Sequence, residues 1–316
     1  MLKQLLRFWN QIERWSMQVR LPFFEGLSLY DVSRFFFKGI VEGNVTSRAG
    51  SIAYSFFLAL FPGIIFLFTL IPFFPVQNLE QEVFDVFERI LPPDTWEASR
   101  ETIQDVMKNK REGLLSLGFF LALIFTTNGI NAIVTNFNQT VHDIAERPFW
   151  KQQLVSMGLT LVLSIFFLIG IVLIIFSSDV LNGILAFFQL DQVSPVAIEL
   201  SRLGLLLALV FIGIVILYNY GTARRKNWRF FSPGAVLATF LIIISSSGFS
   251  YYVANFSQYN KLYGSIGTLM VILLWIYINA LVLIIGFELN ASIAQVKMHH
   301  KKRERELQEM DQRPSR

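Results

Sequence analysis

The sequence predicts an all-α membrane protein with six transmembrane helices. Apolar residues make up 53% of the chain and charged residues only 16%, which is unusual for a soluble protein. Six segments are also apolar over about 18 residues or more, the length that crosses the hydrocarbon core of a bilayer. The clearest is residues 265–291, where Asn279 is the only strongly polar side chain between Ile266 and Phe287.

The six spans are expected at about residues 48–74, 114–138, 154–176, 203–220, 234–256 and 265–291, within a membrane domain of residues 48–292. Residues 1–47 precede them and repeat apolar side chains at helical spacing with bases between, which is typical of amphipathic helices in the membrane interface. Residues 76–112 carry nine acids against five bases and predict a helical hairpin on the outer face. A short polar turn is expected just before the sixth span, and residues 293–316 form a basic tail.

The basic residues predict the orientation. With six spans, both termini lie on the same side of the membrane, and that side holds 20 of the 27 Lys and Arg residues. Because loops rich in Lys and Arg stay in the cytoplasm, both termini are expected there, and the protein is expected in the bacterial inner membrane.

The first span begins at Arg48 and contains Pro62, which removes a backbone hydrogen bond and predicts a kink. Ser51, Ser55, Ala59 and Pro62 fall on one helical face. A stripe of small residues favours a close helix contact over a pathway lining.

The second span becomes polar in its second half. Asn128, Asn131, Thr135 and Asn138 are spaced three, four and three residues apart, so they share one helical face. Amides that face lipid are costly, so this face is expected to meet protein or water. Two interpretations stay open, namely hydrogen bonds between helices and the wall of a polar cavity.

The fifth and sixth spans add further polar or small residues. Ser245, Ser246 and Gly248 lie near the middle of the fifth span, where they predict close packing or local unwinding and are expected to face Asn128. Asn279 and Gly286 share a stripe of the sixth span, which predicts a helix contact.

Glu288 ends the apolar part of the sixth span, as Arg48 begins that of the first. An unpaired charge at this depth is unfavourable, so the two are predicted to be near neighbours at the cytoplasmic rim. The alternative is that each side chain extends separately into the headgroups.

The chain resembles the YihY/BrkB family of bacterial inner-membrane proteins, formerly described as a ribonuclease family. The resemblance rests on SRAGSIAYSFFLALFPGIIFL in the first span, NGINAIVTNFN in the second, NWRFFSPGAVLATF entering the fifth and YGSIGTLMVILLWIYINALVLIIGFELNA in the sixth. It implies a six-helix membrane protein, with transport or envelope roles proposed for members, and it supplies no catalytic residues.

An enzyme is not indicated. Metal-dependent nucleases need clustered His and carboxylate ligands, and only His142, His299 and His300 are present, with no cysteine and no HExxH motif. The sequence favours a transporter or lipid translocator with a polar cleft open to the cytoplasm, over a membrane scaffold as the alternative class. The seven residues expected to line that cleft are Arg48, Asn128, Asn131, Thr135, Ser245, Ser246 and Glu288. The expected partners are membrane lipids and a small solute or lipid headgroup, without nucleic acid, cofactor or metal ion. The oligomeric state is left open.

Overall fold

The computed structural model describes residues 17–19, 26–70, 100–101, 104–105, 112–140, 147–175, 195–223, 230–255 and 257–311. Within them the chain forms seven helices: α2 (Leu29–Glu42), α3 (Val45–Leu70), α6 (Glu112–Asn138), α7 (Phe149–Ile175), α9 (Pro195–Gly221), α10 (Pro233–Asn255) and α11 (Ser257–Asp311). All but α2 contain a stretch long and apolar enough to span a membrane, which confirms the predicted fold class. Of the amphipathic helices predicted within residues 1–47, α2 is described, whereas most of residues 1–25 lies outside the described residues, as does most of the hairpin at residues 76–112.

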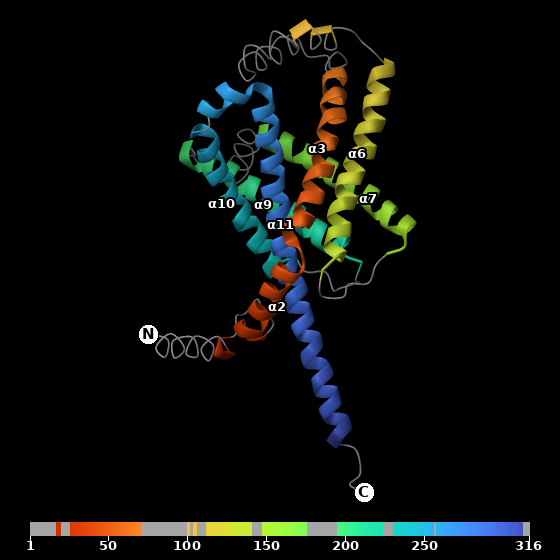
Figure 1. Ribbon diagram of the computed structural model, residues 1–316, viewed down its shortest axis with the longest axis vertical. Helices are drawn as coiled ribbons and strands as arrows, with labels where there is room; N and C mark the ends of the chain where they lie inside the picture. The colour runs from red at the N-terminus through yellow and green to blue at the C-terminus, as the bar shows by residue number, and fades with distance from the viewer. Residues whose placement is uncertain are drawn as a thin grey trace, which may run out of the picture.

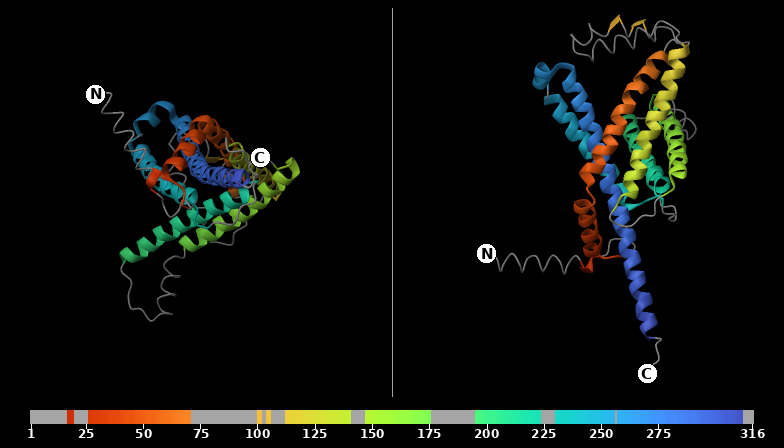
Figure 2. Two further views of the ribbon diagram at one scale, coloured as in Figure 1. Left: turned by 90° about the horizontal axis from the view of Figure 1, so that it is seen from below. Right: turned by 45° about the vertical axis from the view of Figure 1, so that its right-hand side comes forward.

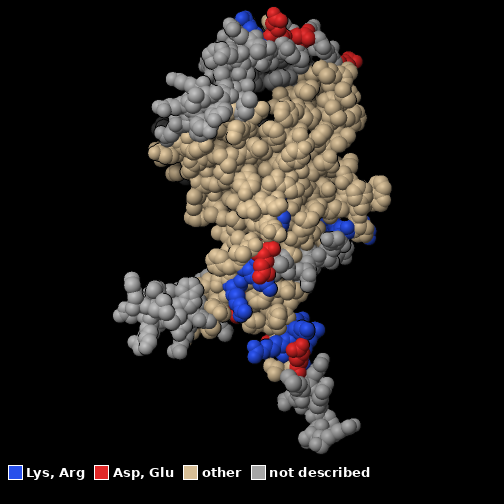
Figure 3. Space-filling view, in the orientation of Figure 1, with Lys and Arg blue, Asp and Glu red and all other residues tan. Residues whose placement is uncertain are grey.

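The distribution of charge fits a membrane-spanning bundle. Figure 3 shows Lys, Arg, Asp and Glu gathered at the two ends of the molecule, with a broad uncharged band between them. The six spanning helices expose large apolar side chains, among them Phe120, Leu161, Phe167, Leu203 and Phe240. Because such side chains are stable against hydrocarbon, the band is the part that lies in the bilayer.

The spanning helices pack as three antiparallel pairs of sequence neighbours, α3 with α6, α7 with α9, and α10 with α11. α11 also packs along α3, and α2 packs against α11 below the bundle. Figure 2 shows the pairs meeting at the end where α2 and the last part of α11 lie, and α10 and α11 diverging from α3 and α6 toward the other end. We call the first the closed end and the second the far end.

Burial follows this arrangement. On α3, Val45, Ala49 and Ile52 near the closed end are buried, whereas Phe61 and Ile64 near the far end are exposed. The described core therefore concentrates toward the closed end of the bundle.

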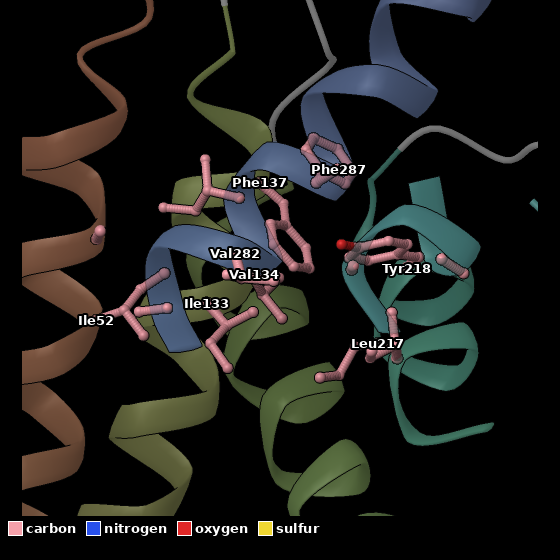
Figure 4. Close-up of a cluster of buried hydrophobic side chains, with 14 of the residues drawn as sticks. Ile52, Ile133, Val134, Phe137, Leu217, Tyr218, Val282 and Phe287 are labelled. Atoms are coloured by element: carbon pink, nitrogen blue, oxygen red, sulfur yellow. The ribbon is translucent and has the colours of Figure 1, made fainter. Parts of the chain in front are cut away.

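An aromatic cluster anchors this core (Figure 4). The rings of Phe137 on α6 and Phe287 on α11 stack with their centroids 4.4 Å apart, and Tyr218 on α9 meets both edge-on. The Tyr218 hydroxyl also donates a hydrogen bond of 2.7 Å to the carbonyl of Leu283. These contacts join one helix from each of the three pairs.

α10 and α11 cross at two glycines. A Cβ on Gly286 would lie 2.5 Å from both the Gly234 carbonyl oxygen and the Tyr218 hydroxyl. Asn290 secures the same crossing, because its side-chain oxygen accepts from the Gly234 N–H at 2.9 Å and its amide donates to the Ser232 hydroxyl at 3.0 Å. The sequence places a helix contact at Gly286, and the structure shows two backbones in close approach there.

The start of the sixth spanning helix differs from the sequence expectation. The predicted polar turn after Tyr259 is helical, and α11 runs without interruption from Ser257 to Asp311. Its last part, predicted only as a basic tail, projects from the bundle as an exposed helix with an i,i+4 pair of Lys302 and Glu306 (Figure 1). No proline interrupts these 55 residues, and such pairs add modest support to an exposed helix.

One packing prediction holds in part and another is wrong. Of the predicted stripe on α3, Ala59 and Pro62 are buried and Ser55 is half-buried. Ser51 is exposed, because the buried face there passes through Ala49, Ile52 and Ala53. Nothing lies within 4 Å of a Cβ built on Gly248, and α10 stays helical around it, so this glycine marks neither close packing nor unwinding. A serine on an exposed face needs no partner from another helix, because its hydroxyl can bond within its own helix, as Ser55 does by donating to the Ser51 carbonyl at 3.0 Å.

Candidate functional site

A buried ion pair lies where the helices converge at the closed end. Arg48 in the second turn of α3 and Glu288 on α11 are 5% and 0% exposed, and an N–H of the guanidinium lies 2.5 Å from the carboxylate oxygen Oε1. The two residues are 240 positions apart, so the contact ties the first spanning helix to the last. The structure thus shows the proximity that the sequence predicts, with the charges paired rather than extended separately.

The turn between α2 and α3 positions Arg48 for this contact. α2 ends at Glu42 with Gly43 as its cap, and Asn44 adopts a left-handed backbone conformation with φ of 48° before α3 begins. Asparagine is among the few non-glycine residues that tolerate this conformation. The turn directs the Gly43 carbonyl at the guanidinium, which donates to it at 3.2 Å.

The guanidinium also caps α6. Its Nε and one terminal nitrogen donate to the carbonyl oxygen of Asn136, at 3.0 and 2.5 Å. The last four carbonyls of a helix have no partner within the helix and carry its negative partial charge. Arg48 therefore neutralises the end of α6 as well as the Glu288 carboxylate.

The carboxylate has a donor of its own. The hydroxyl of Thr140, just beyond the end of α6, donates to the second carboxylate oxygen at 2.8 Å. One turn further along α11, the Ser292 hydroxyl donates to the Glu288 backbone carbonyl at 2.7 Å. A desolvated ion pair is stable only with such additional hydrogen bonds. The ion pair with its ring of donors and acceptors thus joins α2, α3, α6 and α11.

A second arginine caps a second helix at the closed end. Arg147, ahead of α7, donates to the carbonyl oxygens of Tyr220, Gly221 and Thr222 at the end of α9. Partial burial lowers the pKa of its guanidinium, but arginine stays charged at physiological pH. The side chain of Asn138 accepts from the Ala223 N–H at 3.2 Å, which links the ends of α6 and α9.

The amide face of α6 meets α7 over part of its length. The Asn131 side chain accepts from the Ser156 hydroxyl at 3.1 Å, and Thr135 accepts from the Gln152 amide at 3.2 Å. The side-chain oxygen of Gln152 is buried without a hydrogen-bond partner. Asn128, one turn toward the far end, is exposed. At Asn131 and Thr135 the structure shows interhelical hydrogen bonds, whereas Asn128 is not enclosed by neighbouring side chains.

The other predicted positions lie on α10 and α11. Ser245 donates to the carbonyl of Ile242 and Asn279 to that of Trp275, each within its own helix. Ser246 is half-buried, and Pro62 is buried inside α3, which continues through it. The polar cleft predicted between these groups stays a prediction.

A cavity lies beside this network. It has a volume of about 530 Å³ and is lined by residues of all six spanning helices. None of the seven residues predicted for the polar cleft is among its lining residues, and most of its wall is apolar.

The partners of the ion pair went unnoticed in the sequence. Asn136 contributes a backbone carbonyl, which every residue type carries, so only the position of the helix end could have indicated it. Thr140 and Ser292 are common hydroxyl residues without a distinctive spacing. Within the described ranges, no group of three or more His, Asp or Glu side chains could hold a metal ion.

Comparison with known proteins identifies the family. The family described as Virulence factor BrkB matches residues 36–311, which is most of the chain. The chain belongs to this family. No solved structure matches it significantly.

Curated relatives extend over nearly the same length. The ribonuclease-like protein YfkH of Bacillus subtilis is 32% identical over 252 residues, which cover 79% of this chain and 90% of YfkH. A UPF0761 membrane protein of Alteromonas mediterranea is 28% identical over 285 residues, 84% of this chain and 89% of the relative. One from Xanthomonas axonopodis pv. citri is 23% identical and covers 90% of this chain and 65% of the relative. This protein is therefore a polytopic membrane protein in a family of bacterial membrane proteins.

Proposed function

We propose that this protein is a transporter or lipid translocator of the bacterial inner membrane, in which the Arg48–Glu288 pair is the gate at the closed end. The observation that carries the proposal is the position of this pair. It links helices of different pairs where they converge, and the same helices diverge toward the far end. Opening the pair would release α3 from α11 at the closed end without breaking a helix.

The orientation is part of the proposal. Because Lys and Arg are in excess on the side of the termini, we propose that the closed end faces the cytoplasm. The bundle is then closed toward the cytoplasm in this structure, and the inward-facing polar cleft predicted from the sequence belongs to the state in which the pair has separated. Because the chain has no cysteine, single cysteines at Thr95 and Ser315 can test this with an impermeant maleimide. They should label from opposite sides, and labelling from the same side would exclude six spans.

A non-transporting scaffold is the second candidate. The observation that favours it is the exposed, strongly charged last part of α11, where Lys301, Lys302 and Arg303 could hold a partner. The hydrogen bonds of Asn131 and Thr135 to α7 also suit a static bundle. A metal-dependent nuclease would need clustered His and carboxylate ligands, and the residues that the structure describes contain no such cluster.

A reconstituted flux assay separates these candidates. Proteoliposomes would be loaded with fluorescent phospholipids and with a panel of small organic anions, and the wild type compared with Glu288→Gln and Glu304→Gln. Glu304 is an exposed carboxylate on the same helix and serves as the matched control. The proposal predicts movement of at least one probe, changed several-fold by Glu288→Gln and unchanged by Glu304→Gln. If no probe moves with any variant, the result favours the non-transporting scaffold.

A further inference from the structure

The cavity of about 530 Å³ lies between the three helix pairs and is built mainly by α6, α7 and α9. Its volume falls within the roughly 300–1,000 Å³ typical of small-molecule sites. The lining side chains are Phe56, Thr126, Ile130, Ile133, Thr160, Leu163, Ser164, Phe166, Phe167, Leu206, Leu209, Val210, Ile214, Leu217, Ile242 and Leu283, with Gly170 and Gly213.

The chemistry of the wall excludes a charged solute. Among the described residues that line the cavity there is no Asp, Glu, Lys, Arg or His, and their only side-chain polar groups are the hydroxyls of Thr126, Thr160 and Ser164. The Thr160 hydroxyl already donates to the carbonyl of Ser156 in its own helix. A charged group in this space would lose its hydration without finding a partner, so the cavity suits hydrocarbon.

The mouth of the cavity faces the bilayer. Phe167 on α7 and Leu206 on α9 both line the cavity, and they are 68% and 43% exposed on the outside of the bundle. Both belong to membrane spans. The medium at an opening between these helices is therefore lipid, and the groups available to fill it are acyl chains.

We infer that the cavity binds one acyl chain of a phospholipid, which enters sideways from the bilayer between α7 and α9. A void lined by apolar atoms stays dry and lacks packing contacts on its inner side, and a hydrocarbon chain supplies them. This inference rests on the proposed function and narrows its substrate class to lipids, whose headgroup would lie outside the apolar pocket.

A glycine on α9 leaves part of the cavity open. Gly213 on α9 lines the cavity, and a Cβ built on it meets nothing within 4 Å. Gly204 on the same helix is equally open but does not line the cavity. Gly213→Leu would therefore fill the cavity, and Gly204→Leu is its matched control.

A second substitution tests the same inference by narrowing the mouth of the cavity, without changing a residue in its interior. Leu206→Trp would obstruct the opening, and Leu203→Trp, one turn away at an exposed position outside the cavity, is its control. Because these two residues are exposed, neither change disturbs buried packing. This second pair keeps the test decisive if Gly213→Leu fails to fold.

The test uses the full chain in nanodiscs of phosphatidylethanolamine and phosphatidylglycerol doped with a phospholipid that carries a photoactivatable diazirine on its acyl chain. Lipids around the protein label only exposed positions, so the informative sites are Ile130, Ile133 and Ile214, which line the cavity but are at most 5% exposed. Mass spectrometry of the cross-linked peptides would report labelling at these three sites.

The inference predicts labelling of these buried isoleucines in the wild type and in both controls, and a loss of about tenfold in Gly213→Leu and Leu206→Trp. Labelling confined to exposed positions, or equal labelling of the buried sites in all folded variants, would overturn it. Binding is measured here without transport. If the cavity is labelled but the protein moves no probe, the lipid site is retained and the proposed translocator is rejected. If small anions move but the cavity is not labelled, the transporter is retained and the lipid site is rejected.

Discussion

Removing one partner of the Arg48–Glu288 pair should destabilise the protein more than a surface charge change does, and removing both should cost less than the sum of the two single losses. Breaking a buried ion pair on one side costs about 3–5 kcal/mol. Arg48→Met leaves a carboxylate with no exposed surface and is expected at the upper end of this range. Glu288→Met leaves a guanidinium that still donates to the carbonyls of Asn136 and Gly43, so it is expected near the lower end.

The double variant removes both charges, so its destabilisation should fall short of the sum of the single values by about 2–3 kcal/mol. The double variant should still be less stable than the wild type, because the carbonyls of Asn136 and Gly43 lose the guanidinium as their donor. The assay is denaturant-induced unfolding in detergent micelles, followed by circular dichroism.

An exposed pair on the same helix provides the control. Lys302 and Glu306 lie 3.8 Å apart with 79% and 57% of their side chains exposed, and such pairs couple by about 0–1 kcal/mol. Additivity of the Arg48 and Glu288 substitutions within about 0.5 kcal/mol, as for this surface pair, would refute the reasoning that the buried pair holds the closed end together.

Three further predictions concern other parts of the bundle. Arg147→Ala removes the donor to three carbonyls at the end of α9 and should lower stability by about 1–3 kcal/mol in the same unfolding assay. Gly286→Ala places a Cβ 2.5 Å from two oxygen atoms and should lower the melting temperature strongly. Gly50→Ala is the control, because a Cβ there meets nothing within 4 Å, and equal shifts in the two variants would contradict the close crossing of α10 and α11. Asn128→Leu replaces an exposed amide and should abolish flux without lowering the melting temperature if Asn128 lines the cleft, and an activity that follows only the amount of folded protein would argue against it.

The fold was predictable because membrane constraints are strict. A helix must cross about 30 Å of hydrocarbon, so apolar length alone located six spans in the sequence. Depth was also predictable for Arg48 and Glu288, since each is the charge closest to the apolar part of its helix. Their pairing follows because a charge at that depth needs a partner.

Helix faces were harder to predict. Hydrocarbon and protein interior are equally apolar, so the sequence does not distinguish Ala53, which is buried, from Ile64, which is exposed. The cavity was missed for the same reason, because its lining of Ile, Leu and Phe is typical of any lipid-facing surface. Gly286 was recognised as a contact, but its partner Gly234 depends on how α10 and α11 cross.

The central claim is that the closed end opens when the ion pair separates. In this cysteine-free chain, spin labels at Ser47 on α3 and Lys301 on α11 would report the closed end, and labels at Ile65 and Leu273 on the same two helices would report the far end. Double electron–electron resonance in nanodiscs would then measure both distances in the wild type and in Glu288→Gln. Glu288→Gln should add a longer distance at the closed end and a shorter one at the far end. A single unchanged distance at both ends in a folded Glu288→Gln protein would contradict it.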